Sequence, residues 1–338
     1  MDTLRTQTPP LGITEVAWSD EDLVRRFAAV KEAVRAADEP WGHPILASRT
    51  AAALRHGWDG EPAVAHLVTV DGVDVAAAEY ETTSWDNQHL AWLGADVHPA
   101  HRRRGYGEAV LDFLVDRARA EGRTSVGGNS WDAAAPRAFA TRHGFEAKAV
   151  EVNRRQHLAR VDQARLERLH ADALAHAPDY ELVRRVGATP AAELGALAEI
   201  TAAINDAPTD DLDIEDEVFP TERVAAYENA WLGRGDRLMR VCARHRGTGE
   251  LAGQTVVVVE AERPQVAHQH DTSVVRAHRG HRLGLLLKTE MLRWLAEDQP
   301  QVATVDTWNA ESNDHMIGVN EVLGYEVVGR ALAWQRPL

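Results

Sequence analysis

An internal repeat constrains the fold of this chain more than any other feature. The segment Val97–Gly107, VHPAHRRRGYG, aligns with Val274–Gly284, VVRAHRGHRLG, at a constant offset of 177 residues. Further along, Arg142–Phe145 aligns with Val322–Tyr325 at an offset of 180 residues, so three residues are inserted between the two landmarks. Because a repeat of this length carries a complete structural unit, the sequence predicts two domains of one topology. A length of 338 residues agrees with that number.

The same order of secondary structure is predicted around each copy of the repeat. Asp71-Gly72 between two β-type runs is a two-residue hairpin signal, and apolar residues recur at helical spacing after Gly107. In the first copy we expect helices over 19–37, 107–120 and 132–142 and strands over 64–70, 73–83, 89–97 and 124–128, with a last strand after Gly144. In the second copy we expect helices over 191–204, 221–231, 283–297 and 313–323 and strands over 238–243, 251–260, 265–275 and 302–307. The predicted domains are residues 1–158 and 180–338, joined by a helical connector over 159–179.

The aligned segments carry the pattern Arg-x-x-Gly-x-Gly between a strand and a helix, complete in Arg102–Gly107. The first amides of a helix lack intrahelical partners, and the helix dipole is positive at that end. Glycines let a ligand approach the backbone closely, and arginines donate charge-assisted hydrogen bonds. This pattern favours a pyrophosphate site. Solvated arginines and a glycine turn would produce the same letters, but this segment follows a third strand, precedes a long helix and occurs twice.

In these features both halves resemble GNAT-superfamily N-acetyltransferase domains, and the tandem resembles the two-domain bacterial arrangement found in mycothiol synthase. The resemblance covers nearly the whole chain. It implies two α/β GNAT folds, each with a mixed twisted sheet, and acetyl-CoA as the cofactor, with its pyrophosphate on the loop and its pantetheine arm against the preceding strand. The implied binding positions in the first half are Val97, Arg102, Arg103, Arg104, Gly105, Tyr106 and Gly107. Those in the second half are Val274, Val275, Arg279, Gly280, His281, Arg282, Leu283 and Gly284, with Asn309 on the neighbouring strand.

The second half departs from the family's loop pattern. Arg282 stands where the first half has Gly105, and Gly280 stands where it has Arg103. Two interpretations stay open at this point: the Arg282 guanidinium bonds phosphate oxygens, or it fills the site. Asn309 likewise has two interpretations, a pantetheine ligand by resemblance or a strand-end cap.

Two histidines are the candidate catalytic residues. An amine acceptor is protonated at neutral pH and must lose a proton before it attacks a thioester, and histidine is the side chain best suited to accept it. His268 and His270 precede the second loop on one face of a strand, as a His-x-His does in arylalkylamine N-acetyltransferases. The first half has Ala91 and Leu93 there. A pair of half-exposed strand residues is the competing interpretation, and in a regular strand Asp271 points to the opposite face.

Other sites are less well defined. The superfamily's usual general acid is a tyrosine, and its positions hold Ala140 and Asn320 here, which leaves that role unassigned. Seven of the thirteen residues in segment 205–217 are acidic. By resemblance this segment borders the acceptor cleft and would attract a cationic amine, although a solvated acidic loop is the simpler interpretation.

Composition narrows the class of protein. The formal net charge of −15 disfavours nucleic acid as a partner. No apolar run approaches a membrane span, residues 1–13 lack the features of a signal peptide, and Cys242 is the single cysteine. We therefore expect a cytoplasmic protein without a membrane partner and without a metal site. The sequence does not determine its oligomeric state.

The function indicated by the sequence is transfer of an acetyl group from acetyl-CoA to the amine of a small, cationic acceptor by direct attack. The alternative is an acyl-CoA sensor or pseudoenzyme without turnover. The halves are unequal, because the first has the complete loop without a base and the second has histidines with a modified loop. We accordingly expect the first half to bind the cofactor and the second half to acetylate.

Overall fold

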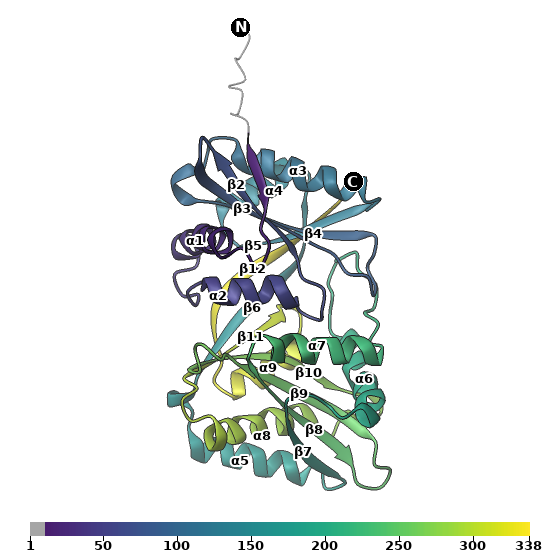
Figure 1. Cartoon of the computed structure of the whole chain (residues 1–338). Coiled ribbons are helices and arrows are strands. Elements are labelled where there is room, and N and C mark those ends of the chain that lie inside the picture. The colour runs from purple at the N-terminus through teal and green to yellow at the C-terminus, as the bar shows by residue number, and fades with distance from the viewer. Residues whose placement is uncertain (1–10) are drawn as a thin grey trace. The chain divides into compact units, whose positions relative to one another are not determined.

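The computed structural model describes residues 11–338, which form two compact units (Figure 1). Unit 1 comprises the described residues up to Gly57, then Glu61–Lys148 and Leu332–Leu338. Unit 2 comprises Trp58–Gly60 and Ala149–Ala331. Most of the N-terminal segment examined for a signal peptide, residues 1–10, lies outside the described residues. Each unit is described separately below.

Unit 1 is a twisted sheet with helices on both faces. Its strands lie in the order β1-β2-β3-β4-β5, followed by the end of β12. Neighbouring strands from β1 to β4 are antiparallel, and β4 and β5 are parallel. Its elements are β1 (Gly12–Glu15), α1 (Glu21–Asp38), α2 (Ala47–His56), β2 (Val64–Val70), β3 (Val73–Glu81), β4 (Leu90–Val97), α3 (Tyr106–Ala120), β5 (Ser125–Trp131), α4 (Ala134–Arg142) and the last residues of β12 (Glu326–Pro337).

Unit 2 repeats this plan. Its strands lie in the order β6-β11-β10-β9-β8-β7, with the first part of β12 beside β6, and its parallel pair is β10 and β11. Its elements are β6 (Glu146–His157, from Ala149 onward), α5 (Gln163–Ala175), β7 (Tyr180–Val186), α6 (Leu194–Ala202), α7 (Thr221–Gly233), β8 (Arg237–His245), β9 (Leu251–Val259), β10 (Val266–Val274), α8 (Leu283–Asp298), β11 (Thr304–Ala310), α9 (Asp314–Val322) and the start of β12.

Local signals account for most of these elements. Asp71 and Gly72 both have positive φ, 50° and 77°, and join β2 to β3 as expected of a primed hairpin turn. The Asp20 side chain caps α1 by accepting a hydrogen bond from the Leu23 amide at 3.0 Å. Four strands and helices, β1, α2, β7 and β12, were not predicted. The weakness of the local signal is clear for α2, which begins after Leu46 without a side-chain cap.

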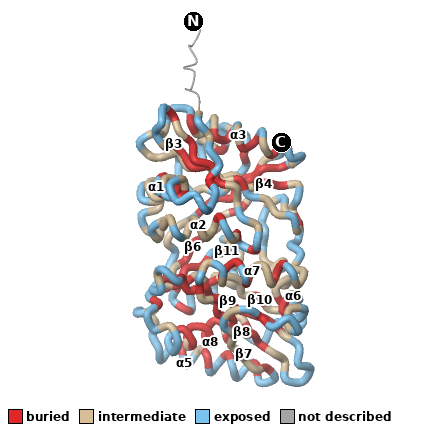
Figure 2. The backbone as a smooth tube through the Cα atoms, in the orientation of Figure 1, coloured by how far each residue is buried: buried red, intermediate tan, exposed pale blue. Residues whose placement is uncertain are grey.

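Central strands of both units, such as β3 and β9, are buried on both faces (Figure 2). In β9 of unit 2, Val256 and Val258 pack with Trp231 of α7, whereas Val257 and Val259 pack in the cluster that contains α8. Such a strand appears in the sequence as a continuous apolar run rather than an alternating one. The helix α5, expected as a connector between domains, belongs to the core of unit 2 through residues such as Leu166.

The last strand of each repeat belongs to the other unit. In unit 1 the Leu338 amide donates to the Thr124 carbonyl at 2.9 Å, and Trp334 Nε1 donates to Ser130 Oγ at 2.9 Å. In unit 2, residues Glu151–His157 of β6 pair antiparallel with β11. Each sheet is therefore completed by a segment from the opposite repeat, whereas the domain ranges written from the sequence keep each repeat contiguous.

Candidate active site

The two Arg-Gly loops adopt the same backbone conformation. In unit 1, Arg103 and Gly105 have φ of 62° and 85°, and α3 begins at Tyr106. In unit 2, Gly280 and Arg282 occupy the matching positions with φ of 87° and 54°, and α8 begins at Leu283. Arg282 thus accepts the left-handed conformation that glycine adopts without strain. Both loops present the first amides of a helix at the end of a strand.

The first arginine of each loop ties the loop to the preceding strand. Arg102 Nε donates to the Val97 carbonyl, and Arg279 Nε donates to the Val274 carbonyl, both at 3.1 Å. The two guanidinium groups also pair with carboxylates: Arg102 with Asp38 at 2.6 Å, and Arg279 with Asp206 at 2.5 Å. These arginines, expected to contact phosphate, therefore shape the loop, and the helix amides are the more available donors.

Arg282 does not fill the second loop. Its guanidinium pairs with Asp172 of α5, and about half of its side chain is exposed. A Cβ built on Gly284, in the first turn of α8, meets only His315 Nε2, at 4.0 Å. The start of α8 therefore leaves room for a ligand at its amides, which favours the first of the two interpretations of this loop over the second.

In both units the parallel strand pair diverges toward the loop. The pairing of β4 with β5 runs from Leu90 to Trp92, and that of β10 with β11 runs from Val266 to His268. Beyond those pairs β4 continues to Val97 and β10 continues to Val274. Strand backbone whose partner has diverged retains amides and carbonyls that a bound molecule can pair with. Val97, Val274 and, immediately after β10, Val275 lie at this end, where cofactor contacts were expected.

A β-bulge in β10 reorients Asp271. The register of β10 against β9 shifts between Gln269 and Thr272, so the strand is not regular there. A bulge changes the side to which following residues point. The condition of a regular strand is therefore not met, and Asp271 lines a cavity of unit 2. Burial raises the pKa of its carboxyl group, and the charge of Arg240 opposes that effect.

The cavity has a volume of about 280 Å³. It is lined by α6 and α7, by β8 to β10, and by a short segment that precedes β2 in the sequence. The lining residues are Trp58, Asp59, Thr201, Ile204, Glu217, Phe219, Arg223, Val224, Tyr227, Arg240, Gln254, Val256 and Asp271. It therefore combines aromatic rings with five charged side chains.

Most of the charges that line the cavity are paired. Arg223 bonds both Asp59 and Glu217, each at 2.8 Å, and Arg240 pairs with the buried Glu228. The two carboxylates around Arg223 exceed its charge by one. The lining therefore has a negative balance without Asp271, and ionised Asp271 increases it. From the acidic segment 205–217, Glu217 reaches the lining, whereas Asp206 pairs with Arg276 and Arg279.

The two predicted histidines have different surroundings. His270 lies between Trp58 and Trp231, with ring centroids 4.7 Å away in each case, and its Nδ1 is 2.6 Å from the Tyr227 hydroxyl. Burial lowers the pKa of His270 to about 3, so the ring is neutral at physiological pH. His268 Nε2 lies 2.7 Å from Glu260 Oε1, and about a third of its side chain is exposed.

Comparisons with known proteins agree with this geometry. Residues 28–145 match the model of the acetyltransferase (GNAT) family. A tandem GNAT protein from the clavulanic acid biosynthesis pathway superposes with a TM-score of 0.79 and 28% identity, over 97% of this chain and 98% of that one. The chain has two tandem GNAT folds. A GCN5-related N-acetyltransferase from Sphaerobacter thermophilus shares the fold, with a TM-score of 0.67 and 16% identity over 98% of this chain and 97% of that one.

Curated relatives of this tandem GNAT protein include two mycothiol acetyltransferases. The one from Stackebrandtia nassauensis is 34% identical over 139 residues, which is 40% of this chain and 44% of the relative. The one from Parafrankia is 32% identical over 154 residues, which is 44% of each. The matched part therefore spans less than half the length of these relatives. The predicted fold class, two tandem GNAT folds with mixed sheets, is confirmed.

Among the helices within residues 11–338, none combines the length and apolar character needed to cross a membrane. In that same part of the chain, no three His, Cys, Asp or Glu side chains converge as the ligands of a metal ion would.

Sequence reasoning missed several residues of the candidate site in unit 2. Trp58 and Asp59 lie in the first repeat, yet they line the cavity of unit 2. Tyr227 contacts His270 from α7, and Asp271 depends on the bulge. Only Asp271 carried a signal, because it adjoins the His-x-His. The other three are identified by contacts between segments that are distant in the chain.

Proposed function

We propose that this protein transfers the acetyl group of acetyl-CoA to the amine of a small, cationic acceptor that binds in the cavity of unit 2. The observation that carries the proposal is the bulge in β10, which brings Asp271 into an aromatic, acidic cavity. The same strand ends at the Arg-Gly loop. One strand thus serves an acceptor site and a cofactor site, as acyl transfer between two bound molecules requires.

Acetyl-CoA would supply an acyl group activated as a thioester. The amides at the start of α8 and of α3 suit its pyrophosphate, because backbone donors and the helix dipole converge there. The open space beside Gly284 agrees with such a ligand in unit 2. The free edge of β10 toward Val274 offers backbone partners to an amide-containing arm. These contacts hold and orient the thioester.

Charge and aromatic lining favour a cationic acceptor. The cavity has more negative than positive charge. Its carboxyl groups belong to Asp59, Glu217 and Asp271, and they are opposed by the charge of Arg223, since Arg240 is matched by Glu228. The aromatic rings of Trp58 and Tyr227 offer faces on which an ammonium group is stabilised by cation–π attraction. A neutral or anionic acceptor would gain nothing from this lining.

Asp271 is the proposed proton acceptor. Its raised pKa brings a carboxylate closer to the basicity that general-base catalysis at neutral pH needs. His270, with a pKa of about 3, is too weak a base and instead orients Tyr227. His268 is partly exposed and bonded to Glu260, so we assign it the release of the proton to solvent. In this assignment Asp271, and neither of the two histidines, accepts the first proton.

Direct attack by the amine is the proposed route. The single cysteine, Cys242, packs in a cluster with Leu197, Ile200 and Val224. Burial raises the pKa of its thiol, which makes it a poor nucleophile. The amine therefore attacks the thioester without an acyl-cysteine intermediate.

Unit 1 is proposed to bind the cofactor without catalysing transfer. Its loop has the conformation of the second loop, but β4 presents the buried Ala91 and the half-buried Leu93 where β10 has His268 and His270. The pairing of β3 with β4 shows no register shift like that in β10. Unit 1 therefore lacks a bulge like the one that, in unit 2, brings a carboxyl group into the cavity.

Thiol release from acetyl-CoA, measured against a panel of mono- and diamines, tests the proposal. Turnover with cationic amines and none with neutral hydroxyl compounds is expected. Binding of acetyl-CoA without turnover by any amine would support the alternative, an acyl-CoA sensor. That alternative draws its support from the positions of the family's usual acid, which hold Ala140 and Asn320.

A further inference from the structure

A buried lysine begins a chain of polar side chains in unit 2. Lys288 of α8 is 1% exposed, and its Nζ donates to Asn320 Oδ1 of α9 at 2.6 Å. Asn320 is fully buried, and its Nδ2 donates to Asn309 Oδ1 of β11 at 2.7 Å. The same Nζ lies 4.7 Å from the centroid of the Tyr325 ring. Three elements are thus linked through side chains that the proposed mechanism has not used.

The fold itself does not need this lysine. Unit 1 has Leu111 at the matching position of α3 and Ala140 at the position of Asn320, and both are buried in an intact unit of the same topology. Burial of an ammonium group costs free energy that one amide oxygen and one ring only partly offset. Leucine would fill the site without that cost. The lysine therefore calls for an explanation other than packing.

A charged lysine fixes the direction of the whole chain. Its ammonium group can only donate, so the Asn320 oxygen must face it and the Asn320 amide nitrogen must face Asn309. The oxygen of Asn309 then accepts that bond, and its Nδ2 points elsewhere. Asn309 lies near the end of β11, beyond the last pair with β10 at Asp306. The N–H groups of Asn309 are thereby offered where the two strands diverge.

We propose that Lys288 is a positioning residue for the cofactor: by orienting Asn320 and Asn309, it makes the Asn309 amide a donor to a carbonyl group of the arm bound between β10 and β11. This inference rests on the proposed function, because it assumes that unit 2 binds acyl-CoA. It also gives Asn320 a role at a position that lacks the family's tyrosine. The role is orientation, since a carboxamide is not an acid.

The proposal makes cofactor binding sensitive to pH. Burial lowers the pKa of Lys288 to about 7, so the charge that fixes the chain is lost as pH rises through that value. The neutral amine can also accept a hydrogen bond, and the orientation of the two asparagines is then no longer imposed. Affinity for the cofactor should accordingly be higher below about pH 7, and binding should raise the pKa of Lys288.

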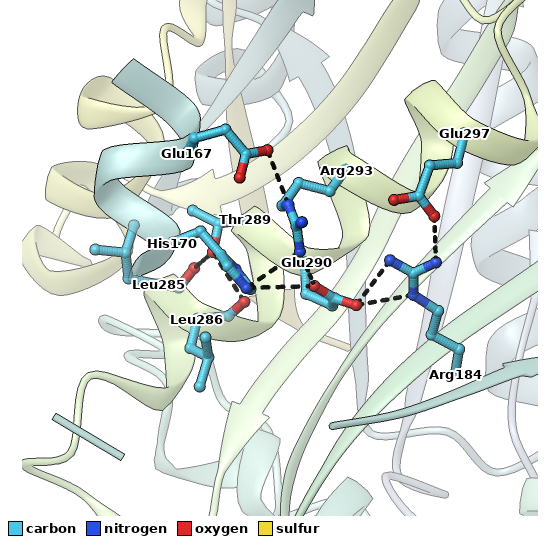
Figure 3. Close-up of polar contacts among 9 residues, drawn as sticks. All are labelled: Glu167, His170, Arg184, Leu285, Leu286, Thr289, Glu290, Arg293 and Glu297. Atoms are coloured by element: carbon cyan, nitrogen blue, oxygen red, sulfur yellow. Dashed lines mark hydrogen bonds and ion pairs between the residues drawn. The ribbon is translucent and has the colours of Figure 1, made fainter. Parts of the chain in front are cut away.

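Other titratable groups near Lys288 are engaged elsewhere. Tyr325, immediately before β12, presents its ring face, and Asp306 of β11 pairs with Arg155 of β6 at 2.6 Å. His315 of α9 lies beside Gly284. The remaining charged groups of this region form a separate network with partners on α5 and β7 (Figure 3). Its members are Glu167, His170, Arg184, Glu290, Arg293 and Glu297.

The chain contains only three lysines, Lys31, Lys148 and Lys288, which makes a direct measurement practical. Full-length protein labelled at the lysine side chains is titrated by NMR with and without coenzyme A, and Lys288→Met identifies the signal. We expect a pKa near 7 without ligand and a rise of at least about 0.5 units with it. A Lys288 pKa that coenzyme A leaves unchanged would overturn the inference.

Affinity provides the second readout. In Gly105→Trp protein, which leaves the second loop to be titrated, coenzyme A affinity should fall at least about threefold between about pH 6 and pH 8.5. Adding Lys288→Met should give the weaker affinity at both pH values, whereas Lys148→Met, the control, should keep the pH dependence. If Lys288→Met binds as before, the inference fails and the proposed function stands. Absence of any binding by the Gly105→Trp protein would refute cofactor binding by unit 2, and with it both proposals. Lys288→Leu, which copies Leu111, provides a second variant if methionine perturbs folding.

Discussion

The hydroxyl group of Tyr227 lies 2.6 Å from Nδ1 of His270, inside a cluster that includes Trp58 and Trp231. This contact explains why the histidine that best matched the expectation for a base is poorly suited to act as one. The ring is neutral, and its Nδ1 is engaged in a hydrogen bond with a tyrosine whose pKa burial raises well above its ordinary value. Adjacent Asp271, turned into the cavity by the bulge, takes the proton in our proposal.

Asp271→Asn should lower kcat by about 10² to 10⁴, because the amide cannot accept a proton. In the unmodified protein the rate should fall as pH drops through the raised pKa of Asp271, and the variant should lose that acid limb. Steady-state rates across pH with a cationic amine check both effects. Asp211→Asn, in the exposed acidic segment, is the control and should leave kcat within about twofold. Equal losses in the two variants would contradict a specific role for Asp271.

Replacing both His268 and His270 with alanine should lower kcat by a comparable factor, about 10² or more, while leaving coenzyme A affinity nearly unchanged. The two residues touch the proposed acceptor side and the route to solvent, not the Arg-Gly loop. Turnover and calorimetric binding should be measured on the same preparations. Full activity in the double variant would show that proton transfer bypasses both histidines.

Replacing Gly105 or Gly284 with tryptophan should distinguish the functions of the two units. A large side chain at the start of α3 or α8 blocks the helix amides, and Gly105 additionally has a φ of 85°, which disfavours any side chain. Each variant should lose one of two coenzyme A sites in a calorimetric titration, and turnover should disappear with Gly284→Trp. Loss of turnover with Gly105→Trp alone would place catalysis in unit 1.

Acid should destabilise the fold through histidines whose pKa values burial lowers, among them His66, His170 and His270. Such a histidine is neutral in the folded state and binds a proton more readily when unfolded. The free energy of unfolding therefore falls as pH decreases below the unfolded pKa of about 6.5, by up to ~1.4 kcal/mol per pH unit for each residue. Urea unfolding at about pH 7.5 and pH 5 measures this loss.

His170→Gln provides the comparison for that acid sensitivity. His170 bonds Thr289 and Arg293 in the network on α8 (Figure 3), and glutamine keeps the hydrogen-bonding capacity without the titration. The variant should lose less stability between the two pH values than the unmodified protein. An identical loss in both would assign the acid sensitivity to other groups.

Several local features could be predicted from the sequence because their causes are local. The hairpin at Asp71-Gly72 requires two positive φ angles that these residues tolerate, and the loops at Arg102 and Arg279 are encoded by short motifs. The repeat at an offset of 177 residues supplied the tandem arrangement. Helices such as α3 follow from the period of their apolar residues.

Other features depend on contacts that no local pattern encodes. The bulge that turns Asp271 arises from the register of β10 against β9, and period-two reasoning assumes a regular strand. Trp58 and Asp59 reach the cavity of unit 2 although they lie more than a hundred residues before its other lining residues. The sequence by itself determined the repeat, the loops and most of the secondary structure, because turn chemistry and periodicity act over a few residues. Only the tertiary structure decided which unit each last strand completes and which carboxyl group enters the cavity, because strand pairing and burial are properties of the packed chain.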